Sequence, residues 1–324
     1  MQDVARVEGA PLSHFAKETE GELSLYNSLV ESHADDVAQT ILLTPFFGPD
    51  KIDGLLAIGS EWESDLKSQL QLIQAALKIA LWQWGPYSPF SKKMQNEAGT
   101  VMQLKRAVTK RPYEQLIPFK TVKAVLWKMS SRDIVKTGER LRGLFDKTVK
   151  VRRLAYDSLS QLQFNCNGMV ELHGQISFNH DVFKVVNKKV LRWAKENRGN
   201  HGSPFFEADK KKYDRVMLVI GKKLQNYRSK LVLVESVIAS LQGLMVTQEY
   251  LNRNLNTMAL KGPELLNAST AAMLKPEPSQ REAFLSLCNE LLQVVKDVNA
   301  SQMLNNDELL RLRALLYSHH YDDI

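Results

Sequence analysis

Cysteine is scarce in this 324-residue chain, which holds only Cys166 and Cys288. Two cysteines so far apart make neither a disulfide framework nor the paired spacing of a zinc site. We therefore expect no bound metal and a reducing, cytoplasmic compartment, with Cys166 as a small buried thiol. Residues 1–11 include acidic side chains and no apolar core, so no signal peptide is predicted; secretion without one is the alternative.

Enzyme motifs are absent as well. The tripeptide Gly221-Lys222-Lys223 lacks both the upstream glycine and the following Ser or Thr of a phosphate-binding loop. No nucleophile elbow occurs, and the histidines are scattered. His173 and His180 are one heptad apart, which places them on one helix face but too far apart to share a metal without a third ligand. We expect a protein without enzymatic activity or cofactor.

Long apolar runs are missing too. No stretch approaches the ~18 uncharged apolar residues of a transmembrane helix, so no helix is expected to span a bilayer by hydrophobicity alone. The most apolar stretch, residues 231–245, contains Glu235 as its only charge. A helix with no polar face must be covered on several sides, which we expect of this stretch.

The pattern that is present is helical, and the alternation typical of strands is not found. Residues 205–260 read as one very long helix that begins after Ser203-Pro204 and ends at Gly262-Pro263. Its apolar residues recur at steps of three and four, as along a helix packed on a partner, at Tyr213, Val216, Ile220, Leu224, Tyr227, Leu231, Val234, Ile238, Leu241 and Met245.

A second long helix is predicted over residues 119–198. Its pattern of threes and fours is regular from Leu141 to Ala194, and Asn167-Gly168 and Gly174 leave open a break between residues 164 and 180. A short turn near 198–204 would reverse the chain, so the two long helices should run antiparallel.

Shorter helices are expected at 12–43, 50–84, 91–110, 280–298 and 307–317. The predicted fold is all-α, an elongated bundle built on a long antiparallel, coiled-coil-like hairpin with shorter N- and C-terminal helices. Its predicted parts are an acidic N-terminal helix (1–48), the long bundle (49–262) and a C-terminal region of short helices (263–324).

Charge is unevenly distributed along the chain, whose net charge is +7. The first 64 residues are acidic, whereas residues 92–153 are strongly basic. A basic block attracts phosphate on a lipid surface or in nucleic acid, although it can also be a solvated helix face. The candidate contacts with anionic lipid are Arg140, Arg142, Lys147, Lys150, Arg152, Arg153, Lys210, Lys211 and Lys212.

Aromatic residues gather next to basic ones at the predicted turn of the hairpin. Trp193, Phe205 and Phe206 flank it, a combination that suits a lipid interface. The alternative is that the two phenylalanines staple the start of the helix to its neighbour.

The stretch Lys150-Val151-Arg152-Arg153-Leu154-Ala155-Tyr156-Asp157-Ser158-Leu159 resembles the middle helix of BAR domains, and residues 206–213 resemble the entry to their third helix. The resemblance covers about residues 60–260. It implies that two chains pair into a curved dimer whose basic face lies on an anionic membrane. Gly168, Gly174, the proline-rich corner at 84–90 and the C-terminal helices depart from that pattern.

Three functions are consistent with these features. The first is a BAR-like scaffold, oligomeric and peripheral to the membrane, that binds or bends anionic membranes. The second is a subunit of an α-helical pore-forming toxin, which the hairpin, the apolar 231–246 segment and the aromatic residues would support. The third is a protein that coats nucleic acid, for which the basic block and nearby Trp and Tyr argue.

Overall fold

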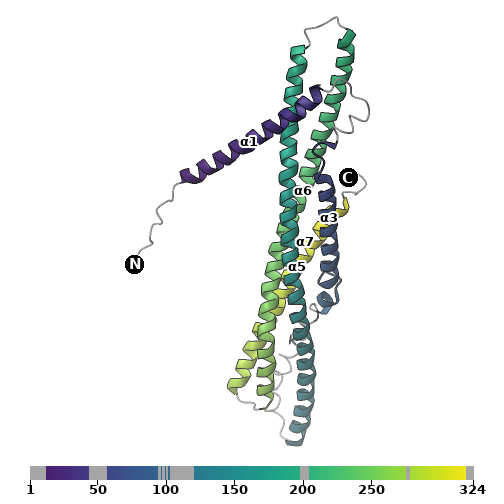
Figure 1. The fold of residues 1–324 in the computed structure, drawn as a ribbon. Helices are drawn as coiled ribbons and strands as arrows, with labels where there is room; N and C mark the ends of the chain where they lie inside the picture. The colour runs from purple at the N-terminus through teal and green to yellow at the C-terminus, as the bar shows by residue number, and fades with distance from the viewer. Residues whose placement is uncertain are drawn as a thin grey trace. The chain divides into compact units, whose positions relative to one another are not determined.

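A computed structural model describes residues 12–43, 57–93, 96, 99, 101–102, 120–197, 204–274 and 278–318. Its helices are α1 (Leu12–Leu43), α3 (Trp62–Gln83), α5 (Lys120–Asn197), α6 (Pro204–Leu274) and α7 (Pro278–Ser318), and none of the described residues lies in a strand (Figure 1). The predicted all-α class is therefore confirmed. The predicted turn near 198–204 falls almost wholly outside the described residues.

The chain divides into two compact units. The first unit consists of residues 1–66 and 170–235, and the second of residues 67–169 and 236–324. Helices α5 and α6 each contribute one segment to both units.

In the first unit, α5 and α6 run antiparallel. His173 of α5 lies 3.1 Å from Glu235 of α6, and further along α5 the ring of Phe183 packs 5.7 Å from that of Tyr227. Helix α1 contacts α5 through an edge-to-face pair of Tyr26 and Phe178. Four apolar side chains of α1 are buried, Val30, Ala34, Ala38 and Ile41.

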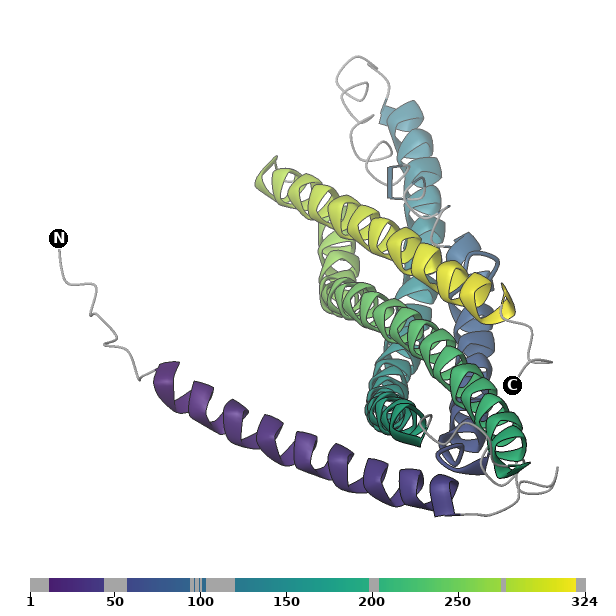
Figure 2. The ribbon, with the colours of Figure 1, turned by 90° about the horizontal axis from the view of Figure 1, so that it is seen from above.

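In the second unit, α6 packs between two antiparallel neighbours. On one side Gln248 Nε2 donates to the carbonyl oxygen of Ala155 in α5 at 3.1 Å. On the other side α7 lies along α6 (Figure 2). Lys261 pairs with Glu290 of α7 at 2.7 Å, and Asn305 of α7 donates to Thr247 Oγ1 at 3.2 Å. The residue that follows α3, Trp84, also contacts α7, because Gln302 of α7 donates a hydrogen bond to its carbonyl oxygen.

The buried positions of the long helices alternate by three and four residues, as expected of helices packed along each other. On α6 the buried positions at these steps are Val216, Ile220, Lys223, Tyr227, Val234, Val237, Leu241, Leu244, Gln248, Leu251, Leu255 and Met258, and Val219, Leu233 and Ser240 beside them are buried as well. At three of the predicted core positions of α6, the residue that is actually buried lies one position earlier in the sequence. Leu224, Ile238 and Met245 are only half-buried, because Lys223, Val237 and Leu244 take the core positions.

Helix α5 runs without a break through residues 164–180. Gly168, one of the residues that left a break open, makes room for α3. A Cβ atom there would lie 3.1 Å from the side-chain amide of Gln69. Gly174 has open space around it, and its cost of about 1 kcal/mol relative to alanine is opposed by the buried neighbours Leu172 and Ile176.

The predicted end of the long helix at Gly262-Pro263 was wrong, because α6 continues to Leu274 with Pro263 inside it. Gly262 is a packing site, since a Cβ there would lie 2.5 Å from Cδ1 of Phe145 in α5. Packing against α5 and the pairing of Lys261 with α7 oppose the cost of an internal proline, about 3 kcal/mol.

Two further boundaries differ from the prediction. Helix α3 begins at Trp62, after a turn in which Gly59 has a φ of 69°, whereas one helix was expected to run through this point; the predicted start at residues 50–56 lies outside the described residues. Helix α7 runs unbroken over 41 residues, whereas two helices with a gap between 298 and 307 were expected. Of the helix predicted at 91–110, residues 94, 95, 97, 98, 100 and 103–110 lie outside the described residues.

The apolar part of α6 is less covered than predicted. Val232 and Val246 are exposed, the latter by 69 %. Contrary to expectation, the stretch Tyr213–Glu264 is long and apolar enough to cross a membrane, judged by length and composition only. Its best 18-residue window has a mean hydropathy of 1.5, and 39 % of that window is buried.

Candidate functional site

Exposed basic side chains of α5 lie among exposed apolar ones in the second unit. We name the α5 face by the six residues that define it, Arg142, Val149, Lys150, Arg153, Tyr156 and Phe164, all of them exposed. Positions 142, 149 and 156 follow at steps of seven, so they share one side of the helix. The opposite side of α5 carries its buried residues, among them Thr148, Val151 and Ala155.

The basic groups of this face are exposed. In the part of the chain that the structure describes, Arg142, Lys150 and Arg153 form no ion pair, nor does the exposed Lys147 beside them. Two carboxylates, Asp146 and Asp157, are exposed on the same helix and reduce the local positive charge.

The predicted lipid contacts include one residue with a structural role. Arg152 is half-buried, and its Nη1 donates to Oδ1 of Asn256 at 2.8 Å, which ties α5 to α6. Arg140 lies on α5, but its side chain is outside the described residues.

The remaining predicted contacts belong to the first unit. Lys210 is exposed on α6, whereas the side chains of Lys211 and Lys212 are outside the described residues. Of the aromatic residues expected at the tip, Trp193 is half-buried on α5. Phe205 and Phe206 lie in the first turn of α6, with side chains outside the described residues.

A buried lysine, which the sequence analysis did not single out, clamps the turn before α3. Lys223 Nζ donates to the carbonyl oxygen of Ile58 and, at 3.1 Å, to Ser60 Oγ. The same ammonium lies 5.2 Å from the ring centroid of Phe183. Burial lowers the pKa of Lys223 to about 8, against the opposing pull of Glu63 and Glu61. The predicted seam placed Leu224 at this step, so the sequence held no local signal for the clamp.

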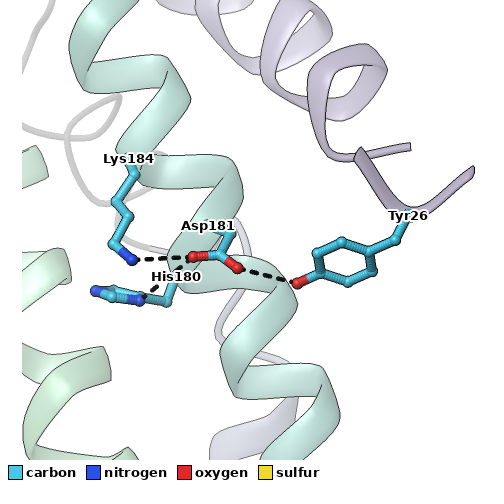
Figure 3. Close-up of polar contacts among 4 residues, drawn as sticks. All are labelled: Tyr26, His180, Asp181 and Lys184. Carbon is cyan, nitrogen blue, oxygen red and sulfur yellow. Dashed lines mark hydrogen bonds and ion pairs between the residues drawn. The ribbon is translucent and has the colours of Figure 1, made fainter. Parts of the chain in front are cut away.

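A second polar cluster joins α1 to α5 around Asp181 (Figure 3). Tyr26 donates its hydroxyl to Asp181 Oδ2 at 3.1 Å, and Lys184 pairs with Oδ1 at the same distance. His180 Nδ1 lies 3.8 Å from Oδ1, and its buried Nε2 has no hydrogen-bond partner among the described residues. Burial, followed by the charge of Lys184, lowers the pKa of His180.

The histidines and cysteines do not assemble a metal site in the described parts of the chain, where no group of three or more His, Cys, Asp or Glu could hold an ion. His173 pairs with Glu235, and His180 packs against Tyr227. The expectation of a buried Cys166 is confirmed, and burial raises the pKa of its thiol.

In comparisons with known proteins, no family model, curated protein or solved structure matches the chain.

Proposed function

We propose that the protein is a non-enzymatic, peripheral scaffold that binds anionic membrane surfaces through the α5 face. One observation carries the proposal: the cations Arg142, Lys150 and Arg153 share their exposed surface with Tyr156 and Phe164. Exposed aromatic rings are not expected on a basic helix face that contacts only solvent, whereas aromatic rings next to cations suit the headgroup region of a membrane. Each cation near an anionic surface adds about 1 kcal/mol.

Pairing of two chains belongs to the same proposal. Its support is that residues 150–159 resemble the middle helix of BAR domains. These residues include Arg153 and Tyr156 of the α5 face. Pairing would raise the number of cations that reach one membrane, and avidity would strengthen binding. Sedimentation equilibrium of the purified chain reports the oligomeric state directly.

Co-sedimentation with vesicles tests the membrane-binding proposal. We expect binding to vesicles of equal parts phosphatidylcholine and phosphatidylserine, weakening with salt, and little binding to phosphatidylcholine alone. The variant Arg142→Glu/Arg153→Glu should bind about 30-fold more weakly or worse, as expected from losing two cations. The matched control Lys222→Glu/Arg228→Glu changes net charge equally at exposed positions of the first unit and should bind like the wild type.

Two results would contradict the proposal. Equal losses in both variants would mean that only net charge matters. Binding to single-stranded RNA at salt concentrations where vesicles are released would favour the nucleic-acid coat instead.

A pore-forming subunit is the second candidate, and the apolar stretch of α6 favours it. Most of its 18-residue window is not buried within the chain, and Val246 is exposed. Release of a trapped dye from the same vesicles separates the two functions, because a scaffold deforms vesicles without emptying them. Leakage that stops on Val246→Asp would support insertion of α6.

A further inference from the structure

Helix α3 has a second apolar face, directed away from the core. Within the second unit its core face buries Leu70, Ile73, Leu77 and Ala80. The outward residues Leu72, Ala75, Ile79 and Trp82 follow at steps of three and four, and all are exposed. A helix with apolar residues on both faces buries the outer one against something else.

The corner that follows α3 is firmly built. The N–H groups of Trp84 and Gly85 both donate to the carbonyl oxygen of Ala80, at 3.0 and 3.1 Å. Only glycine fits at position 85, because a Cβ would overlap the backbone of Leu81. Ser88 N then donates to the Gly85 carbonyl oxygen at 3.0 Å, which closes the turn.

The base of this corner is anchored in the core. Trp84, Ser88 and Phe90 are buried, and Gln302 of α7 donates to the carbonyl oxygen of Trp84 at 3.1 Å. Two aromatic side chains nevertheless point outward from it, Trp82 with 76 % and Tyr87 with 81 % of their surface exposed. We call the outward residues Leu72, Ala75, Ile79, Trp82 and Tyr87 the aromatic edge.

Along the chain, the charges that flank the aromatic edge between residues 66 and 96 are all positive. From Leu66 to Asn96 the chain has no Asp or Glu, while it has Lys67, Lys78, Lys92 and Lys93. Lys78 and Lys92 are exposed. A segment without carboxylates that combines exposed apolar side chains, Trp, Tyr and lysine is complementary to the headgroup region of an anionic bilayer.

We infer that the aromatic edge inserts into the interface of an anionic membrane, with Trp82 and Tyr87 at headgroup level. The inference rests on the proposed function: the α5 face supplies the charge-dependent contact, and the aromatic edge supplies an apolar one. The stripe from Leu72 to Trp82 is roughly 15 Å long. A single helix stripe of this length offers a small area compared with a stable protein interface, which covers about 800 Å² on each partner.

Tryptophan fluorescence tests the insertion of Trp82. In a Trp127→Phe/Trp193→Phe background, the remaining tryptophans are Trp82 and the buried Trp62 and Trp84. On addition of vesicles of equal parts phosphatidylcholine and phosphatidylserine, we expect a blue shift and quenching by brominated lipid. Adding Trp82→Ser should abolish both changes.

Binding of a second pair of variants tests the affinity that the edge supplies. Trp82→Ser/Tyr87→Ser should weaken vesicle binding about tenfold and leave its salt dependence unchanged, because an apolar contact is lost. The matched control Met303→Ser/Tyr317→Ser removes exposed side chains from α7 in the same unit and should bind like the wild type. Unchanged circular dichroism shows that the variants fold.

The outcomes separate the two proposals. If vesicles bind with salt dependence but Trp82 is neither shifted nor quenched, the insertion inference is wrong and the proposed function stands. If no anionic vesicle binds at low salt, both are wrong. If Trp82→Ser/Tyr87→Ser instead abolishes self-association while vesicle binding persists, the edge covers a second chain and not lipid.

Discussion

The hydroxyl of Tyr227 in α6 donates a 3.0 Å hydrogen bond to the carbonyl oxygen of Gly59, which holds the turn from which α3 begins. Trp62 Nε1 donates to the same oxygen at 2.7 Å. Gly59 adopts a φ of 69°, and a Cβ there would lie 2.8 Å from the Tyr227 hydroxyl oxygen. Backbone conformation and close packing therefore both require glycine.

Substitution of this glycine should destabilise the first unit. For Gly59→Ala we expect a loss of about 2–4 kcal/mol, from the left-handed backbone together with overpacking against Tyr227. Tyr227→Phe removes one hydrogen bond and should cost about 1 kcal/mol. Urea unfolding followed by circular dichroism measures both. The double variant should lose less than the sum, because phenylalanine lacks the oxygen with which the Cβ collides; strict additivity would contradict the packing account.

The buried Lys223 makes stability depend on alkaline pH. Its pKa is about 8 in the folded protein against an ordinary 10.5, so between these values the unfolded chain binds more protons. Stability contributed by this group therefore rises as pH increases from 8. Tyr227, whose pKa is raised by burial, acts in the opposite direction above pH 10.

The difference between the wild type and Lys223→Met isolates this effect. Measured by urea unfolding, the wild type should gain stability relative to the variant between pH 8 and 10. Lys222→Met removes an exposed neighbouring lysine and is the matched control. If the free energies of unfolding of the wild type and of Lys223→Met change in parallel between pH 8 and 10, the Lys223 ammonium is not desolvated.

His180 makes stability depend on acidic pH. Because burial lowers its pKa below 6.5 in the folded state, the unfolded chain takes up the proton first, and stability falls as pH drops below 6.5. His180→Phe keeps a ring against Tyr227 and should remove part of this fall. Thermal unfolding at pH 5 and pH 7 checks it. An equal fall in the wild type and the variant would mean that other groups cause it.

Gly262 and Phe145 should be coupled in the second unit. Gly262→Ala places a methyl group 2.5 Å from Phe145 Cδ1, and we expect a loss of about 1–3 kcal/mol from overpacking. In a Phe145→Leu background the same substitution should cost less, because the smaller side chain leaves room. A full double-mutant cycle by urea unfolding measures the coupling. Equal costs in both backgrounds would show that Gly262 is not required to make room for Phe145.

The sequence predicted the helical class because periodicity by threes and fours persists over dozens of residues. The prediction failed at glycines, because a glycine can either interrupt a helix or make room for a neighbouring side chain. Gly262 was interpreted as a helix end and Gly168 as the place of a possible break, yet each admits a neighbouring side chain, Phe145 and Gln69 respectively. Local rules cannot show such contacts, because the partners lie about 100 positions away in the sequence.

The candidate site shows the same limit. Periodicity favoured Leu224 as a core residue over Lys223, because nothing in the local sequence reveals the carbonyl oxygen of Ile58 that the lysine binds. The basic block predicted the cations of the α5 face. It did not predict that Arg152 binds Asn256 while Arg153, its neighbour, remains exposed.

A polarity-sensitive dye on the α5 face tests membrane binding most directly. The native cysteines are buried, so Ser160→Cys can be labelled selectively on the exposed side of α5, and Ala300→Cys on α7 is the matched control. With vesicles of equal parts phosphatidylcholine and phosphatidylserine, we predict a blue shift at position 160, reversed by high salt, and none at position 300. Equal shifts at both positions, or none at position 160 while the protein is bound, would contradict the account.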